Sequence, residues 1–238
     1  MPPTFDRWVV LQAHRFGLMG KDEIQSLKKL VQPDSRIADV GANQGLYTLF
    51  FSSLVPLGSV YAFEPDPALF ASLKENVRRN GADNVTLFNA AAASRTAKLC
   101  LQPGLINRGD NQIVQSAQLD SGTIQVDAIS LDQAIPGLKL DLLKIDVQGF
   151  EVEVLRGAQG LFRANPGLSI LIEFWPYGLS KAGSRPEELL DILRGAGFSV
   201  VRYAKDDRYE PFSYAAKDWD RPSRFCNLIA TRAQIGNH

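Results

Sequence analysis

The chain is 238 residues long, 45% of them hydrophobic and 22% charged, which suits one globular domain with a sizeable apolar core. Lysine and arginine together number 26, as do aspartate and glutamate, so the formal net charge is zero. A neutral chain lacks the basic excess that drives nucleic-acid binding. No apolar run is as long as a membrane span, and the N-terminal residues do not read as a signal peptide. We therefore predict a cytoplasmic protein that has neither nucleic acid nor a membrane as its partner.

Helical and strand patterns alternate along most of the chain, which predicts an α/β fold with a largely parallel sheet. The first helix is expected near residues 21–31, where apolar residues share one face and a proline follows. Seven strands are expected over residues 36–40, 60–63, 85–89, 142–146, 169–174, 199–203 and 226–231. Two weaker strand patterns, at residues 97–101 and 123–127, flank a polar stretch and predict a hairpin insertion.

We interpret the chain as one domain, because neither an internal repeat nor a disordered linker interrupts it. Residues 1–35 are expected to form an N-terminal helical segment of that domain and a candidate lid, and residues 36–238 its main body. The connection 204–224 is a second candidate lid, because it is long for a compact domain and mixes aromatic with charged residues. The strand before it is expected to run parallel to its neighbours, which would start the connection at the ligand-binding edge. The alternative is a solvated loop whose aromatic residues pin it to the domain.

The most informative segment is DVGANQG at residues 39–45, which follows a strand pattern and precedes an apolar helix pattern. Glycine at position 41 allows a tight turn and a close approach of the backbone to a ligand. Such a turn delivers the ligand to a helix N-terminus, where free N–H groups favour a carboxylate or a phosphate.

Glu64, at the end of the next strand, completes this pattern. A carboxylate there can accept hydrogen bonds from both hydroxyls of a ribose. Its separation from Gly41 is close to the roughly 20 residues expected of nucleoside-binding βαβ units. The alternative is that Gly41 and Gly45 are ordinary turn and packing glycines and that Glu64 caps the following helix. The order strand, glycine turn, helix, strand, acid favours the nucleoside site.

The composition of the loop distinguishes between cofactors. A dinucleotide fingerprint has glycine at its first, third and sixth positions, which here are Gly41, Asn43 and Leu46. The last two do not suit a pyrophosphate that lies against the backbone. S-adenosylmethionine (SAM) has no phosphate, and its carboxylate and amine could be bound by the loop backbone, Asn43 and Asp39. The predicted cofactor is therefore SAM and not NAD.

Five blocks of sequence, in order, resemble the FkbM-type methyltransferase family from about residue 37 to 198, with a weaker tail to 232: DVGANQGLYT, FEPDP, NAAAA, LDLLKIDVQGFEVEVLRGA and LIEFWP. The resemblance implies a Rossmann-like class I methyltransferase fold, a mostly parallel seven-stranded sheet with an antiparallel C-terminal strand and helices on both faces. It also implies O-methylation of a small metabolite, often a polyketide or a sugar. One departure is Gln148, where the family commonly has glutamate; it keeps the shape of that residue without its charge.

The loop motif and the resemblance together give ten candidate cofactor-binding residues: Asp39, Gly41, Ala42, Asn43, Gly45, Glu64, Pro65, Asn89, Ala90 and Asp146. The resemblance places Asn89 and Ala90 near the adenine, where a small residue leaves room for the ring. No cluster of Cys, His and carboxylate residues has metal-site spacing, so we predict no required metal.

The candidate catalytic residues are Asp146, Lys144 and Glu173. Asp146 ends an apolar strand at the edge where open α/β sheets bind ligands, and it could orient the SAM amine, accept the proton of a hydroxyl acceptor, or do both. The alternative for Asp146 is a helix N-cap. Lys144 shares its face of the strand, and a buried lysine needs a carboxylate or carbonyl partner that can be purely structural. Glu173 either lines the acceptor pocket or pairs with Lys144.

Trp175 and Tyr177 follow the strand that carries Glu173, and they are candidate walls of the acceptor pocket or else core residues. The leading hypothesis is a SAM-dependent O-methyltransferase that acts on a small-molecule hydroxyl acceptor. The alternatives are a SAM-fold binding module that lost catalysis and, less favoured, an NAD-linked oxidoreductase. No NPPY-like segment follows the fourth main strand, which argues against amino-methylation of nucleic-acid bases. The sequence leaves the oligomeric state open.

Overall fold

The computed structural model describes residues 21–104, 111–114, 122–135, 137, 139–203, 209–219 and 221–232. Residues 1–20 of the N-terminal candidate lid lie outside the described residues, and so do residues 204–208 and 220 of the connection that was the second candidate.

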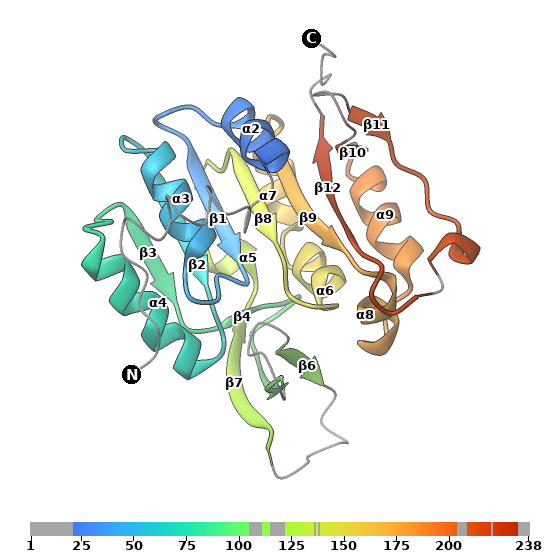
Figure 1. Cartoon of the computed structure of the whole chain (residues 1–238), viewed down its shortest axis with the longest axis horizontal. Helices are drawn as coiled ribbons and strands as arrows, with labels where there is room; N and C mark the ends of the chain where they lie inside the picture. Colours follow the sequence, from blue (N-terminus) through green and yellow to red (C-terminus); the bar gives the residue numbers. More distant parts are fainter. Residues whose placement is uncertain are drawn as a thin grey trace.

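An eight-stranded sheet forms the centre of the molecule, in the order β11-β10-β12-β9-β8-β1-β2-β3 (Figure 1). Its strands are β1 (Arg36–Val40), β2 (Ser59–Phe63), β3 (Val85–Phe88), β8 (Leu142–Ile145), β9 (Ser169–Phe174), β10 (Ser199–Tyr203), β11 (Tyr209–Pro211) and β12 (Cys226–Thr231). Strands β3, β2, β1, β8 and β9 pair in parallel, and β12 runs antiparallel to β9. The predicted mostly parallel sheet with an antiparallel C-terminal strand is confirmed.

The far edge of the sheet differs from the expectation in two respects. The sheet has one strand more than the seven predicted, because β11 pairs with β10 inside the connection that was expected to be irregular. The expectation that β10 runs parallel to its neighbours is wrong, since it pairs antiparallel with both β12 and β11. Strand β10 still points the same way as β9, because both run antiparallel to β12. The connection after it therefore starts at the edge where β9 ends.

Helices cover both faces of the sheet, as predicted. They are α2 (Lys21–Leu30), α3 (Leu46–Leu54), α4 (Pro67–Arg79), α5 (Leu131–Ala134), α6 (Glu151–Arg156), α7 (Gln159–Ala164), α8 (Pro176–Lys181), α9 (Pro186–Gly195) and a 3-10 turn at Ala216–Asp218. Alternate strand residues face opposite layers. Ile37 packs in the cluster of α2 and α3, whereas Ala38 and Val40 pack in the cluster of α5 to α9.

Helix α2 belongs to the same core as the rest of the chain. Its residues Ile24 and Leu27 are buried in one cluster with Ile37 of β1 and Phe51 of α3. Helix α2 is therefore packed on the main sheet, and the interpretation of a single domain stays a prediction. Among the residues that the structure describes, no helix combines the length and apolarity needed to cross a membrane.

A second, four-stranded sheet is inserted between β3 and β8 in the order β4-β7-β5-β6. Its strands are β4 (Ala91–Ala92), β5 (Ala97–Gln102), β6 (Gln112–Val114) and β7 (Ile124–Ile129). Strands β5 and β7 pair antiparallel, as the two weaker strand patterns predicted, and β6 adds to the other side of β5. In Figure 1 this small sheet extends below the main sheet, near the carboxyl ends of β1 and β8. The loops that follow these two strands belong to the candidate site.

Candidate functional site

The loop after β1 requires glycine at position 41. Gly41 has a φ of +81°, and a Cβ built on it would lie 1.8 Å from the carbonyl oxygen of Asp146. The backbone N–H groups of Gly41 and Ala42 both donate to the carbonyl of Phe63, each at 3.0 Å. The ends of β1, β2 and β8 therefore meet at this turn, and they can do so only because residue 41 has no side chain.

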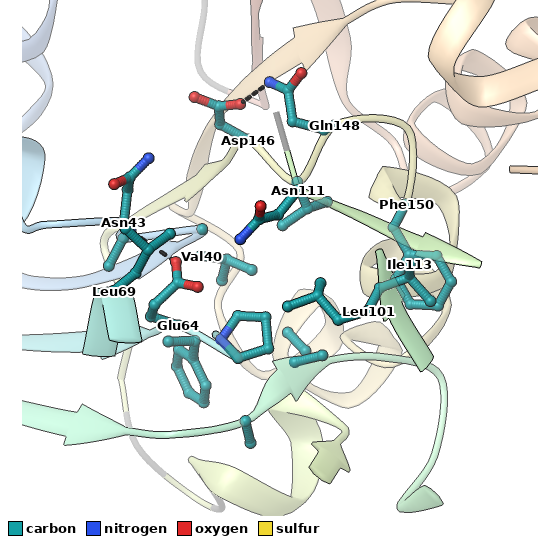
Figure 2. A pocket seen from close by; sticks show the side chains of 18 of the residues that line it. Val40, Asn43, Glu64, Leu69, Leu101, Asn111, Ile113, Asp146, Gln148 and Phe150 are labelled. Atoms are coloured by element: carbon teal, nitrogen blue, oxygen red, sulfur yellow. Dashed lines mark hydrogen bonds between the residues drawn. The ribbon is translucent and has the colours of Figure 1, made fainter. Parts of the chain in front are cut away.

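Glu64, directly after β2, faces the same loop across the site. Its side chain accepts the backbone N–H of Asn43 at 2.8 Å through one oxygen and that of Asp66 at 2.9 Å through the other. Figure 2 shows Glu64 pointing to Asn43, whose φ is +53°. Burial raises the pKa of Glu64 to about 7, because desolvation outweighs the two backbone hydrogen bonds. The helix after it is capped by Asp66, not by Glu64, since the Asp66 side chain accepts from Ala68 and Leu69.

A buried cluster of charges lies beneath the loop. The Lys144 ammonium donates to the carbonyl of Gly41 at 3.1 Å and lies 3.2 Å from Asp39 Oδ1 and 3.7 Å from Asp146 Oδ2. Burial alone would lower the pKa of Lys144, but the carboxylates of Asp39 and Asp146 outweigh that effect and hold the pKa above its ordinary value. Lys144 thus stays protonated at neutral pH and supplies charge to the site, not a base. Thr48 satisfies the other oxygen of Asp39 at 2.6 Å.

Gln148 links the ends of β8 and β9. Its amide nitrogen donates to Asp146 Oδ1 at 3.0 Å and to Glu173 Oε2 at 3.1 Å. Both partners are carboxylates, which only accept hydrogen bonds, so a glutamate at position 148 would bring three acceptors together. The side chain of Asp146 is 37% exposed, and Figure 2 shows it beside Gln148. Asp146 is not a helix N-cap, because α6 begins after Phe150.

These loops surround a cavity of about 310 Å³, at the lower end of the size range of small-molecule sites. Eight of the predicted site residues line it: Gly41, Ala42, Asn43, Glu64, Pro65, Ala90, Lys144 and Asp146. Six others are not among its lining residues: Asp39, Gly45, Asn89, Glu173, Trp175 and Tyr177. The structure thus brings most of the cofactor candidates to one cavity and leaves the acceptor candidates outside it.

The residues outside the cavity have other partners. The Asn89 amide donates to the carbonyls of Glu64 and Pro65, at 2.9 and 3.2 Å, and so fastens the loop that carries the acid. The indole of Trp175 donates to the carbonyl of Pro222, and its ring packs on that of Tyr177 at 5.8 Å between centroids. Tyr177 is 48% exposed. Both aromatic residues lie within four positions of Glu173, the residue that Gln148 joins to Asp146.

The aromatic residues of the connection 204–224 pack on the core. Phe212, Tyr214 and Trp219 each contact Phe174 of β9, with ring centroids 5.2, 5.4 and 5.3 Å from it. None of them lines the cavity. These contacts favour the interpretation of aromatic residues that pin the connection to the domain, and its role as a lid stays a prediction.

Sequence reasoning missed Glu151, which fixes the shape of the Asp146 loop. One oxygen of this fully buried side chain accepts the backbone N–H of Val147 at 3.2 Å and of Gly149 at 3.1 Å. Burial raises the pKa of Glu151 to about 7. The residue stands inside the block LDLLKIDVQGFEVEVLRGA, but one sequence gives no sign that its side chain turns back on the preceding loop.

Sequence reasoning also missed much of the largely apolar wall of the cavity, including Leu101, Asn111, Ile113 and Phe150. The first three belong to the small sheet or its loop, whose approach to the site no local pattern indicates. Within the described ranges, no group of three His, Cys, Asp or Glu residues could hold a metal ion.

Comparison with known proteins supports this picture. "Methyltransferase 1" of Beauveria bassiana is 30% identical over 145 residues, 52% of this chain and 58% of that protein. "2-O-methyltransferase NoeI" of Sinorhizobium fredii is 31% identical over 153 residues, 57% of this chain and 62% of that protein. "Hexuronic acid methyltransferase AglP" of Haloferax volcanii is 29% identical over 193 residues, 81% of this chain and 74% of that protein. The chain thus matches less than two thirds of the length of the first two relatives.

Among solved structures, a putative rRNA-methylase from Clostridium thermocellum superposes with a TM-score of 0.55 at 15% identity, over 91% of this chain and 96% of that chain. At this identity the likeness concerns the fold alone. The methyltransferase FkbM domain matches residues 39–200, which run from the buried Asp39 of the glycine loop, through Glu64 and Asp146, to β10. The chain therefore belongs to the FkbM family of SAM-dependent methyltransferases.

Proposed function

We propose that this chain transfers the methyl group of SAM to a hydroxyl oxygen of a small metabolite. The cavity fits the cofactor on three observations. Gly41 lets the loop after β1 lie directly against the backbone of Asp146, so that both loops line the cavity. The carboxylate of Glu64 stands at the wall where a ribose would donate, and Asn43 lines the cavity beside it. When bound, SAM supplies a methyl group activated by its sulfonium.

The observation that carries the proposal is the position of Asp146. Its carboxylate lines the cavity and is partly exposed, whereas Asp39 and Lys144 beneath it are buried. Lys144 approaches one of its oxygens and Gln148 the other, so the carboxylate is held from two sides. A hydroxyl acceptor has to lose its proton as the methyl group arrives, and a base in reach accelerates such a step by roughly 10²–10⁴-fold. We assign the acceptance of that proton to Asp146.

The names of two relatives support an acceptor of the sugar class, since one is called a 2-O-methyltransferase and the other a hexuronic acid methyltransferase. The acceptor would reach Asp146 past Gln148 and Glu173, where carboxylates and an amide can bind sugar hydroxyls. Trp175 and the exposed Tyr177 extend this surface with aromatic rings. The candidate acceptor residues are therefore Glu173, Trp175 and Tyr177, next to the cavity and not within it.

The test is the formation of S-adenosylhomocysteine (SAH) from SAM in the presence of uronic acids, other sugars and hydroxylated polyketides. The substitution Asp146→Asn should lower turnover by about 100-fold or more, because the amide keeps the shape but cannot take the proton. It should change the affinity for SAH by less than about tenfold. Asp127→Asn, which removes an exposed carboxylate on β7, is the matched control and should leave turnover unchanged.

Two results would overturn the proposal. Full turnover in Asp146→Asn would show that this carboxylate is not the base. Tight binding of SAH together with no methyl transfer to any hydroxyl acceptor would favour a binding module that has lost catalysis.

A further inference from the structure

The small sheet forms one wall of the cofactor cavity. Leu101 at the end of β5, Asn111 before β6 and Ile113 within β6 all line the cavity. Leu101 is only 1% exposed, so its side chain is an integral part of that wall.

Asn111 attaches this wall to the side of the cavity that carries Glu64. Its amide nitrogen donates to Asp66 Oδ2 at 2.8 Å, and its amide oxygen accepts the backbone N–H of Gly104 at 2.9 Å. Asp66 caps α4 through its other oxygen, and its own N–H donates to Glu64 at 2.9 Å. A short chain of hydrogen bonds thus runs from the small sheet through Asp66 to Glu64.

Ile113 attaches the same wall to the opposite side of the cavity. It packs with Phe150, which follows the Asp146 loop, in an apolar cluster with Ala91 and Ala128. Figure 2 shows Leu101, Ile113 and Phe150 together at one end of the cavity, with Asp146 and Gln148 away from them. The small sheet therefore spans the cavity, from the loop after β2 to the loop after β8.

We propose that Asn111 is a positioning residue that fastens the small sheet as a clasp over the adenosine part of the cofactor. The inference rests on the cofactor part of the proposed function and is independent of the acceptor. The Asn111 amide meets a carboxylate, and hydrogen bonds to charged groups are the stronger ones. One such bond closes the wall firmly, yet a single bond can break and reform. Opening of the Asn111–Asp66 hydrogen bond then precedes the release of SAH and the entry of SAM.

The experiment measures the dissociation rate of SAH by stopped-flow displacement and its affinity by calorimetry. Asn111→Ala and Asn111→Asp should each speed dissociation by about tenfold or more, the second because two carboxylates would then face each other. Asn80→Ala is the matched control, since it removes an amide hydrogen bond from the other end of α4. It should leave the dissociation rate unchanged.

A double substitution separates a clasp from a general loss of stability. Combining Asp66→Asn with Asn111→Asp exchanges the amide and the carboxylate. The new amide at position 66 keeps an oxygen for the cap of α4 and donates to the new carboxylate, which can still accept from Gly104. The dissociation rate should return to within about twofold of the wild-type value, whereas Asn111→Asp alone stays fast.

The outcomes are distinct. Unchanged dissociation from a folded Asn111→Ala variant, or a double variant that releases SAH as fast as Asn111→Asp, would overturn the clasp while the cofactor assignment stands. Wild-type protein that fails to bind SAH at all would overturn the proposed function and the clasp together.

Discussion

Replacing Glu64 with alanine should weaken the binding of SAM and SAH by at least about tenfold. In the free protein, the two carboxylate oxygens of Glu64 accept the N–H groups of Asn43 and Asp66 at 2.8 and 2.9 Å. Each oxygen has a second lone pair, which can accept a hydrogen bond from one of the two ribose hydroxyls. The substitution therefore removes the ligand's partner and also slackens the loop that carries Asn43.

The magnitude follows from the charge on the acceptor. A hydrogen bond to a charged group contributes about 1.5–3 kcal/mol, so the loss of one such bond raises the dissociation constant about 10- to 150-fold. Tenfold is the lower bound, because the ribose can donate two bonds and the loop loses two of its own.

The affinity of the wild-type protein should also depend on pH. Burial raises the pKa of Glu64 to about 7, and the ribose hydroxyls donate best to the ionised form. Binding then has to expel the proton below that pH, so affinity should fall by up to about tenfold for each pH unit below 7 and level off above it. Glu64→Ala should lack this dependence.

Calorimetric titration with SAH between about pH 5.5 and 8.5 tests both statements, with thermal unfolding in each buffer to show that the variant is folded. Glu75→Gln is the control, because it removes an exposed carboxylate from α4 that pairs with Arg78 and Arg79. A folded Glu64→Ala variant with the wild-type dissociation constant, or with the same pH dependence, would refute the assignment of Glu64 to the ribose.

Three further predictions follow from the site. Gly41→Ala should abolish SAH binding or folding, because its Cβ would lie 1.8 Å from the carbonyl of Asp146, whereas Gly167→Ala meets nothing within 4 Å and should be tolerated in the same binding and melting assays. Glu151 has a pKa of about 7 in the folded protein against an ordinary value of 4.5, so its stability contribution is complete below about pH 4.5 and is lost as the pH rises towards 7. Denaturant unfolding should therefore show wild-type stability falling relative to Glu151→Gln by up to about 1.4 kcal/mol per pH unit over that window. A constant difference would contradict the raised pKa of Glu151. NAD should not compete with SAH in calorimetry, since Asn43 and Leu46 stand where a dinucleotide loop has glycines. Micromolar binding of NAD would contradict the assignment of SAM as the cofactor.

Local and repeated signals in the sequence determined the fold and the cofactor loop. The turn at Gly41, the N-cap at Asp66 and the alternation of strand and helix patterns all depend on residues within a few positions of one another. Such short-range preferences can be predicted from the sequence, because backbone sterics and capping hydrogen bonds involve neighbouring residues. The predicted parallel core of the sheet and its antiparallel C-terminal strand followed from them and from the family pattern.

Only the tertiary structure decided which side chains meet. Gln148 joins Asp146 to Glu173, Lys144 pairs with Asp39, and Asn111 reaches Asp66, and most of these partners lie far apart in sequence. The sequence left the partner of Lys144 open and offered Glu173 either Lys144 or the acceptor pocket, because a buried charge needs compensation but does not specify its source. The strand β11 and the approach of the small sheet to the cavity were equally hidden, since the pairing of a sheet edge and the docking of an insertion are settled by the packing of the whole chain.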